Sequence, residues 1–509
     1  MSKLFKAAML VTIFSVITRA MGFLMKIILS RSLDPTTLGE YQIAMSIFSV
    51  LLTLIASGLP LIISRKVSYY SSNNNPSSSN KSASAGLVIA FTISIVFSVL
   101  IYFFKDFISE TFKSQEIGNM VVSLIPALVF SSIYSILRGS LWGQKKFFSI
   151  SFSEFFEQLI RIIFLILLIY VPITSIDNGV KATFSLSIAC IFSSILVLFQ
   201  YFKNGNKLIN PKGELLPTIK ESSSITLTRT ASSIVTMIIS FIIPLRLVTF
   251  GYTEAQAMAE FGIVTGMALP LITIPGTFIS SIAVALVPEI SSHTTNIDNG
   301  KKIHGMDTLK NQISIALNLA LVISFMLVPA FLALGIPIAE IVFKNTRAGA
   351  YITAGSILMI TMGINQITSS ILNAIGLEMK AMKNYIFGAI SLLFCIYFLP
   401  RYIGAMSLVV AMLSLSLIAG LLSLKMLKKR NLLKANLSVL IFKLVIITAI
   451  SSLLTYLLYG ALSKFISIFF ACSISGIVSL ICFFALCYVF NIATIKVMIS
   501  TKLFKKRKS

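Results

Sequence analysis

Long apolar segments alternate with short polar ones along all 509 residues of the chain. A helix needs about 20 mostly apolar residues to cross a bilayer, and fourteen segments have about that length. They lie at residues 10–30, 42–64, 85–104, 118–138, 155–174, 183–202, 223–248, 261–290, 312–339, 350–376, 384–400, 404–424, 437–460 and 465–494. The pattern predicts an all-α polytopic membrane protein with about fourteen transmembrane helices.

Two cations interrupt the first of these segments. Arg19 lies nine residues inside it, and Lys26 follows seven residues later, so both side chains lie on one face of a helix. A charge at the bilayer centre costs at least about 2.5–3.5 kcal/mol. We therefore expect this face to line an aqueous cavity that binds an anion. The alternatives are that both side chains snorkel to opposite interfaces or form ion pairs inside the protein.

The composition is typical of a membrane protein, and the positions of the cysteines do not indicate disulfides or metal ligands. Hydrophobic residues make up 56% of the chain and charged residues 12%, and the mean hydropathy is +0.94, whereas soluble domains carry about 25% charged residues. The five cysteines all lie in apolar segments, as expected of small core residues and not of disulfides or metal ligands. They are Cys190, Cys395, Cys472, Cys482 and Cys487.

The charge distribution predicts the topology. A net charge of +25, from 42 basic and 17 acidic residues, could indicate a nucleic-acid partner. The basic residues instead gather in alternate connections, among them 425–434 and the C-terminal 502–508. This is the bias of cytoplasmic loops. We therefore expect both termini in the cytoplasm, contacts with anionic lipids and no nucleic acid.

Other charged residues of the predicted helices have two interpretations each. Arg65 follows Pro60 at a helix end, and Arg229 lies near the cytoplasmic end of its helix. Each could contact a substrate in the cavity or simply face the cytoplasmic interface. Glu157 and Arg161 are four residues apart with the acid first, the spacing of an intrahelical pair at a buried interface.

Two stretches are expected to depart from regular helix. The long segment 261–290 contains Pro270, Pro275 and Pro288, so we expect it to be bent or broken. The polar stretch Ser71–Ser84 is low in complexity and predicts a mobile cytoplasmic loop.

Weak internal similarities suggest two halves. Three matches recur in the same order at offsets of 210, 228 and 233 residues: Arg19 with Arg229, Pro60 with Pro288, and Gly143 with Gly376. They predict two six-helix lobes related by a pseudo-two-fold axis along the membrane normal. The expected domains are an N-terminal lobe at 1–205, a cytoplasmic linker at 206–222, a C-terminal lobe at 223–430, and two extra helices with a basic tail at 431–509.

Signatures of enzymatic chemistry are absent from the sequence. It contains no Gly-x-x-x-x-Gly-Lys-Ser/Thr loop, no His-Glu-x-x-His and no Asp-rich metal motif. We expect a transporter and not an enzyme, with no cofactor or metal. Few carboxylates lie within the predicted helices, so the choice among Na⁺, H⁺ and the membrane potential as the driving force stays open.

Several motifs, in order along nearly the whole chain, resemble one family. They are Arg19 with Gly22-Phe23, Gly39-Glu40-Tyr41-Gln42, Gly58-Leu59-Pro60 to Arg65, Arg138-Gly139 to Lys145, Glu154 to Arg161, and Gly262 to Ser291 through Pro270, Pro275 and Pro288. This combination resembles the MurJ/SpoVB branch of the multidrug/oligosaccharidyl-lipid/polysaccharide flippase superfamily. The overall pattern is more similar to the sporulation-type subgroup than to the MurJ subgroup.

The resemblance implies a flippase in the bacterial cytoplasmic membrane. Such a protein moves lipid II, an undecaprenyl-pyrophosphate-linked glycan, by alternating access between two lobes, and its other partners are membrane lipids and cell-wall synthesis enzymes. It also implies that basic residues of the first two helices, here Arg19 and Arg65, bind the headgroup. Where the family often has a second arginine six residues after the first, this chain has Met25 with Lys26 beside it. The last two helices would border a groove for the lipid tail.

These considerations give a set of candidate residues and three rival functions. Substrate-binding candidates are Arg19, Lys26, Arg65 and Arg229, and structural or gating candidates are Glu157, Arg161, Pro60, Pro270, Pro275 and Pro288. The rivals are a flippase for another polyprenyl-linked polysaccharide unit, a multidrug or cation antiporter of the same superfamily, and a scaffold for wall-synthesis enzymes. A cationic cavity disfavours the antiporter because its cargo is cationic.

Overall fold

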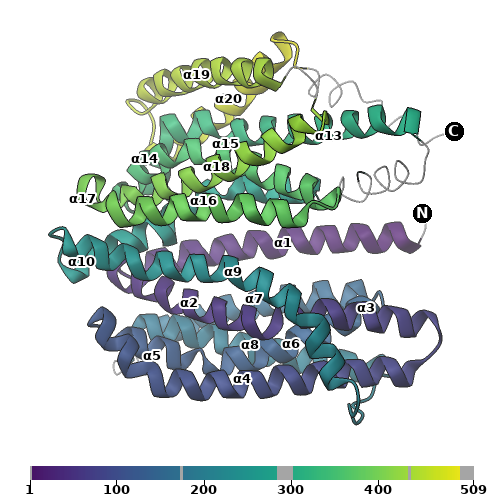
Figure 1. Ribbon diagram of the computed structural model, residues 1–509. Coiled ribbons are helices and arrows are strands. Elements are labelled where there is room, and N and C mark those ends of the chain that lie inside the picture. The colour runs from purple at the N-terminus through teal and green to yellow at the C-terminus, as the bar shows by residue number, and fades with distance from the viewer. Residues whose placement is uncertain (1–2, 172–175, 284–289, 291–301, 434–436, 493–509) are drawn as a thin grey trace. The chain divides into compact units, whose positions relative to one another are not determined.

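The computed structural model describes residues 3–171, 176–283, 290, 302–433 and 437–492. All regular elements in those ranges are helices (Figure 1). Thirteen stretches are long and apolar enough to cross a membrane. The helix α7 (Phe147–Tyr170) is of similar length, but Glu154, Glu157 and Arg161 make it too charged to count among them. The prediction of an all-α polytopic protein with about fourteen transmembrane helices is confirmed.

The chain forms two compact units, Met1–Gly262 and Ile263–Ser509. This division differs from the predicted lobes at its boundary. The helix α9 (Leu215–Thr249), expected to open the C-terminal lobe, packs against helices of the first unit, and its first residues belong to the predicted linker 206–222. The repeat-based lobes stay a prediction, because contacts and repeats need not divide a chain at the same residue.

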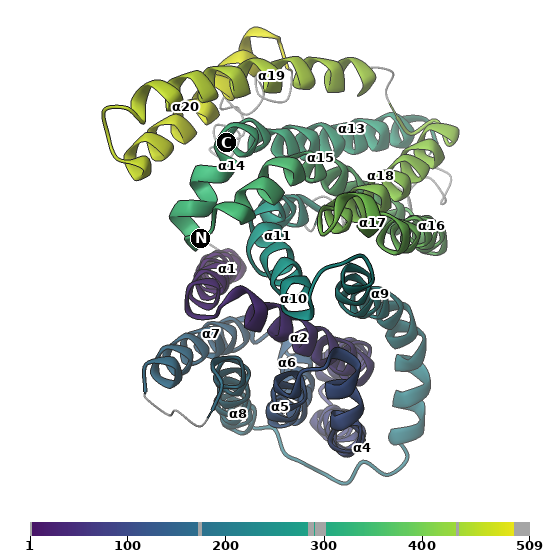
Figure 2. The same ribbon diagram turned by 90° about the vertical axis from the view of Figure 1, so that its left-hand side faces the viewer.

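The first unit is a bundle of helices. It contains α1 (Lys3–Ser32), α2 (Pro35–Ala56), α3 (Leu59–Ser72), α4 (Pro76–Phe112), α5 (Gln115–Ser123), α6 (Ile125–Gly143), α7, α8 (Asn178–Lys203), α9 and α10 (Glu254–Gly262). Viewed along the helices in Figure 2, α1 lies beside α7, and α8 lies between α7 and α5. Asp34, Asn75 and Asp177 cap the N-termini of α2, α4 and α8 with their side chains.

Proline divides the second predicted span into α2 and α3. The helix α2 ends at Ala56, and α3 begins with Pro60 in its first turn, where a missing N–H breaks no hydrogen bond. Glycines of α6 pack on the restarted helix. A Cβ at Gly139 would lie 2.6 Å from the Pro60 carbonyl oxygen, and one at Gly143 would lie 2.6 Å from that of Ser64. This small-xxx-small spacing lets the two backbones approach closely.

The Ser71–Ser84 stretch was predicted wrongly as a mobile loop. Only residues 73–75 form a turn, and α4 begins at Pro76. The polar side chains of Ser79, Asn80, Ser82 and Ser84 are buried. Asn80 accepts a hydrogen bond from the Tyr201 hydroxyl at 3.4 Å, and Ser84 Oγ accepts one from the Ile209 amide at 3.0 Å. Composition misled here because small hydroxyl side chains suit a tightly packed membrane helix as well as a loop.

The second unit begins with an irregular stretch. It contains a π-helical turn at Ile263–Ala268, α11 (Leu269–Ile272) and a short helix Ile274–Ala283. The buried Pro270 and Pro275 each lie near the start of a helical piece. The predicted break in this segment is therefore present. Pro288 lies outside the described residues.

Two apolar clusters lie among the remaining helices of the second unit. These helices are α13 (Lys302–Met326), α14 (Val328–Phe343), α15 (Thr346–Ala374), α16 (Glu378–Phe398), α17 (Pro400–Ile403), α18 (Met406–Lys429), α19 (Leu437–Leu462) and α20 (Ile468–Val489). Polar pairs join neighbouring helices: Gln366 Nε2 donates to Ser280 Oγ at 2.5 Å, and Asn384 Nδ2 donates to Ser423 Oγ at 3.0 Å. The helices α19 and α20 form a hairpin along α14 (Figure 2).

Candidate functional site

The helix α1 places Arg19 and Lys26 beside α7. Phe14 forms edge-to-face contacts with Phe148 and Phe155, at ring-centroid distances of 5.9 and 5.8 Å. One face of α1 therefore packs on α7, and Met25 is buried on the same face. Arg19 and Lys26 are both exposed, and they lie about a quarter turn from this packed face.

The two cations are also separate from the exposed apolar face of α1. That face carries Ile13, Val16, Ile17 and Leu24, with exposed fractions of 41–62%. At about 100° per residue, its centre lies roughly a third of a turn from Arg19 and Lys26. The cations thus form a strip between the packed face and the apolar face. The predicted common orientation of the two side chains along the helix is present.

The polar side chains of α7 extend this cationic strip. Arg161 interacts electrostatically with Lys26 across the α1–α7 contact, and its Nη2 donates a hydrogen bond of 2.9 Å to the Tyr41 hydroxyl of α2. Glu157 lies close enough to Arg161 and Arg138 to interact electrostatically with both. In the described part of the chain, no ion pair within 4 Å joins Glu157 to Arg161.

Among the described residues, the predicted pairing of Glu157 with Arg161 is therefore an electrostatic interaction without a direct ion pair within 4 Å. Arg161 reaches the neighbouring helix α2 instead, because its guanidinium finds a hydroxyl acceptor there. The ion pair that α7 does form joins Glu154 to Arg138 of α6. Sequence reasoning missed this pair. Both residues stood in the family motifs, but their separation of 16 positions gives no helical periodicity that would have joined them.

Arg229 is tied to the break between α2 and α3. Its Nη1 donates a hydrogen bond of 3.0 Å to the Ser57 carbonyl oxygen. Gly58 makes this approach possible, since a Cβ there would lie 2.5 Å from Thr226 Oγ1 of α9. The Arg229 guanidinium thus satisfies an orphan carbonyl at the C-terminal end of a helix, where a cation is favourable. The structure gives this substrate-binding candidate a structural contact.

Arg65 and Lys66 are neighbours with different surroundings. Lys66 is mostly buried and forms ion pairs with Glu214 at 3.2 Å and Glu221 at 3.1 Å. Arg65 points into an open cleft of about 550 Å³ formed by α3, the end of α6 and the start of α7. We call it the Arg65 cleft. Its lining residues are Ser64, Arg65, Ser68, Tyr69, Ser72, Trp142, Gly143, Lys145 and Phe147.

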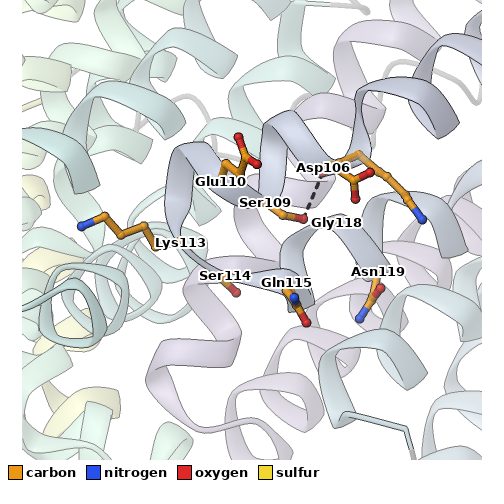
Figure 3. Close-up of a pocket in the computed structure, with 9 residues that line it drawn as sticks. Asp106, Ser109, Glu110, Lys113, Ser114, Gln115, Gly118 and Asn119 are labelled. Atoms are coloured by element: carbon orange, nitrogen blue, oxygen red, sulfur yellow. Dashed lines mark hydrogen bonds between the residues drawn. The ribbon is translucent and has the colours of Figure 1, made fainter.

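A second cleft of about 660 Å³ lies at the opposite end of the first unit, between α4 and α5 (Figure 3). Ser109 Oγ donates to the Lys105 carbonyl oxygen at 3.0 Å, which is the dashed line in the figure. Lys105 and Lys113 are balanced here by Asp106 and Glu110. Lys113 is further paired with Glu254 at 2.6 Å. The cleft carries no excess of either charge.

The described residues offer no metal site. They contain no group of three or more His, Cys, Asp or Glu side chains placed to hold a metal ion. The functional candidates that the structure brings together are Lys26 and Arg161, and Arg19 lies on the same side of α1 two turns before Lys26. Arg65 and Arg229 take part in separate features of the same unit, and Pro60, Pro270 and Pro275 mark helix breaks.

Comparison with known proteins finds a matching family model and relatives of similar sequence. The family model "Polysaccharide biosynthesis protein" matches residues 4–294, more than half of the chain. Stage V sporulation protein B of Bacillus subtilis (strain 168) is 24% identical over 399 residues, which cover 76% of this chain and 75% of that protein. Lipid II flippase MurJ of the same organism is 21% identical over 324 residues, covering 58% of this chain and 59% of MurJ.

A solved structure described as lipid II flippase MurJ in an inward closed conformation shares the fold. It superimposes with a TM-score of 0.73 at 16% sequence identity, covering 95% of this chain and 99% of the MurJ chain. The all-helical fold, the multi-pass pattern and the family match point the same way. The chain belongs to the polysaccharide biosynthesis protein family and is a MurJ/SpoVB-type flippase of the multidrug/oligosaccharidyl-lipid/polysaccharide superfamily.

Proposed function

We propose that this flippase translocates lipid II across the bacterial cytoplasmic membrane by alternating access. Arg19 and Lys26 would hold the pyrophosphate of the headgroup. The single observation that carries the proposal is the cationic strip of α1, two unlike cations on one face of a spanning helix, apart from its exposed apolar face.

The chemistry of this strip favours a phosphorylated ligand. Lys26 and Arg161 are like charges in electrostatic contact, and an anion between or beside them would relieve their repulsion. Lysine binds phosphate as a point charge, while arginine presents a planar fork of donors. A cationic drug would be repelled by Lys26 and Arg161, which disfavours the antiporter alternative. The similarity to lipid II flippase MurJ supports the specific cargo.

A second candidate cargo is another polyprenyl-linked polysaccharide unit, favoured by the family model for polysaccharide biosynthesis. It would present the same pyrophosphate to Arg19 and Lys26. The two cargoes differ in the glycan. We further propose that transport draws on the membrane potential or on a Na⁺ or H⁺ gradient, and that both termini face the cytoplasm, where enzymes of wall synthesis supply the precursor.

Complementation tests the proposal. A bacterial strain depleted of its own lipid II flippase is supplied with the wild-type chain, Arg19→Ala, or the control Lys464→Ala, which changes an exposed loop cation outside the strip. We expect growth with wild type and control, and loss of growth with Arg19→Ala at equal membrane abundance. Growth restored by Arg19→Ala would contradict the mechanism. If the wild-type chain does not restore growth but exports another polyprenyl-linked glycan in vesicles, the second cargo is the substrate.

A further inference from the structure

The Arg65 cleft contains two cations and no carboxylate. Arg65 of α3 and Lys145 of the α6–α7 turn both line it, and both are exposed. Among the residues that the structure describes, no carboxylate oxygen lies within 4 Å of either side-chain nitrogen. The adjacent Lys66 shows the contrast, since Glu214 and Glu221 neutralise it. The cleft therefore has an uncompensated charge that suits an anion.

The backbone around the cleft positions Lys145. The chain leaves α6 and enters α7 through a turn in which Lys145 has a left-handed conformation, with φ of 60°. Its amide donates to the Trp142 carbonyl oxygen at 2.9 Å. Gly143 lies beneath, in direct contact with α3 at Ser64 and Val67. This contact keeps Lys145 and Arg65 on the same side of the α3–α6 crossing.

Aromatic rings and hydroxyl groups complete the lining. Trp142 and Tyr69 are 48% and 64% exposed, although both are large apolar side chains. Trp142 packs edge-to-face on Phe147 at a centroid distance of 5.6 Å. Exposed Trp and Tyr at a helix end are typical of the membrane interface at headgroup depth. Ser64 and Ser68 add hydroxyl donors on one face of α3, whereas the Ser72 hydroxyl donates to the Tyr69 carbonyl oxygen at 2.8 Å.

This combination differs from the cleft between α4 and α5. That cleft has a similar volume and also contains two lysines, but Asp106 and Glu110 balance them and no aromatic ring lines it. The Arg65 cleft lies on the side of the first unit that the loop charges predict to be cytoplasmic. Basic pockets between helices on that side bind phosphate headgroups of lipids, and about 550 Å³ is room for one headgroup.

We propose that the Arg65 cleft binds the phosphate of an anionic membrane-lipid headgroup in the cytoplasmic leaflet. Arg65 and Lys145 contact the phosphate, the hydroxyls of Ser64 and Ser68 donate to its oxygens, and Trp142 and Tyr69 cover the remainder of the headgroup. The site is separate from the cationic strip of α1. If the bound lipid is the polyprenyl pyrophosphate cargo, this proposal rests on the proposed function and adds a second binding site to it. If the lipid is an ordinary anionic phospholipid, the proposal is independent of that function.

The composition of the chain supplies a direct probe, because Trp142 is its single tryptophan. Intrinsic fluorescence of the full-length protein in neutral detergent therefore reports on this cleft. Four ligands are titrated separately: phosphatidylglycerol, phosphatidylcholine with the same acyl chains, undecaprenyl pyrophosphate, and inorganic pyrophosphate. We expect saturable changes with phosphatidylglycerol or undecaprenyl pyrophosphate, and the stronger of the two identifies the source of the headgroup. Phosphatidylcholine should bind at least tenfold more weakly.

Variants connect the signal to the two cations. Arg65→Gln and Lys145→Gln should each weaken binding roughly fivefold, and the double variant about 30-fold. Arg65→Lys should bind nearly as wild type, which separates loss of charge from misfolding. The matched control is Lys146→Gln, which changes an exposed neighbour outside the lining. Arg19→Ala should keep the fluorescence response even where it abolishes flipping, so failure of one proposal is distinguishable from failure of the other.

Three results would overturn the proposal. Equal affinity for phosphatidylcholine, whose choline group cancels the phosphate charge, would show that the cleft does not select an anionic headgroup. Unchanged affinity of the folded double variant Arg65→Gln/Lys145→Gln would show that the two cations do not bind the lipid. If inorganic pyrophosphate binds as tightly as either lipid, the ligand of the cleft is a soluble anion and not a lipid.

Discussion

Arg229 Nη1 of α9 donates a hydrogen bond of 3.0 Å to the Ser57 carbonyl oxygen, across 172 positions of the chain. Ser57 follows the last residue of α2, where proline interrupts the span, so its carbonyl has no partner in a continuing helix. The neighbouring contacts follow the same face of α9, with Ser233 Oγ donating to Thr53 Oγ1 at 3.1 Å. Arg229 therefore fastens α9 to the α2–α3 junction.

Removal of this cation should loosen the junction. Arg229→Ala is expected to lower the free energy of unfolding by about 1 kcal/mol, the value of a cation at a helix C-terminus. Arg229→Lys should recover part of the loss, since it keeps the charge without the guanidinium geometry. Thermal unfolding in detergent measures both, with the exposed Lys220→Ala of the same helix as the control. A wild-type melting temperature for Arg229→Ala, together with reduced flipping, would assign Arg229 to the substrate instead.

The glycines of α6 provide a packing test. Gly139→Val and Gly143→Val would drive a side chain into the Pro60 and Ser64 backbone. Overpacking of this kind is expected to cost about 1–3 kcal/mol. The control is Gly460→Ala in α19, where an added Cβ meets nothing within 4 Å. Size-exclusion profiles after heating should show early aggregation of the α6 variants only, and equal profiles would exclude a tight α3–α6 contact.

Lys66 is predicted to hold the first turns of α9 on α3. Lys66→Gln should destabilise the protein by about 1 kcal/mol or less, because the ion pairs with Glu214 and Glu221 are partly exposed. In a double-mutant cycle, Glu214→Gln should have a smaller effect in the Lys66→Gln background than in the wild type. The coupling should also weaken as salt concentration rises. Strict additivity of the two substitutions would show that this contact contributes nothing in solution.

The α7 charges are predicted to be interdependent. Tyr41→Phe removes the acceptor of the 2.9 Å bond from Arg161 and should cost about 1 kcal/mol. Arg161→Leu should cost more, since it leaves Glu157 with Arg138 as the cation that interacts with it. Glu157→Gln added to Arg161→Leu should then recover part of the stability, because the amide carries no charge. Thermal unfolding of the single and double variants measures this, and a double variant less stable than Arg161→Leu would refute the coupling.

The sequence by itself determined the all-helical class, the number of spans and the common face of Arg19 and Lys26, because helical periodicity and bilayer thickness act on neighbouring residues. It also located the broken segment through Pro270 and Pro275, since proline acts on its own helix. The tertiary structure alone decided that Arg161 bonds Tyr41, that Arg229 bonds Ser57, and that Arg65 and Lys145 share a cleft. It also decided that the helix α4 begins at Pro76 and buries Ser79, Ser82 and Ser84. These contacts join helices far apart in the chain, and local patterns do not specify which polar side chain finds which partner.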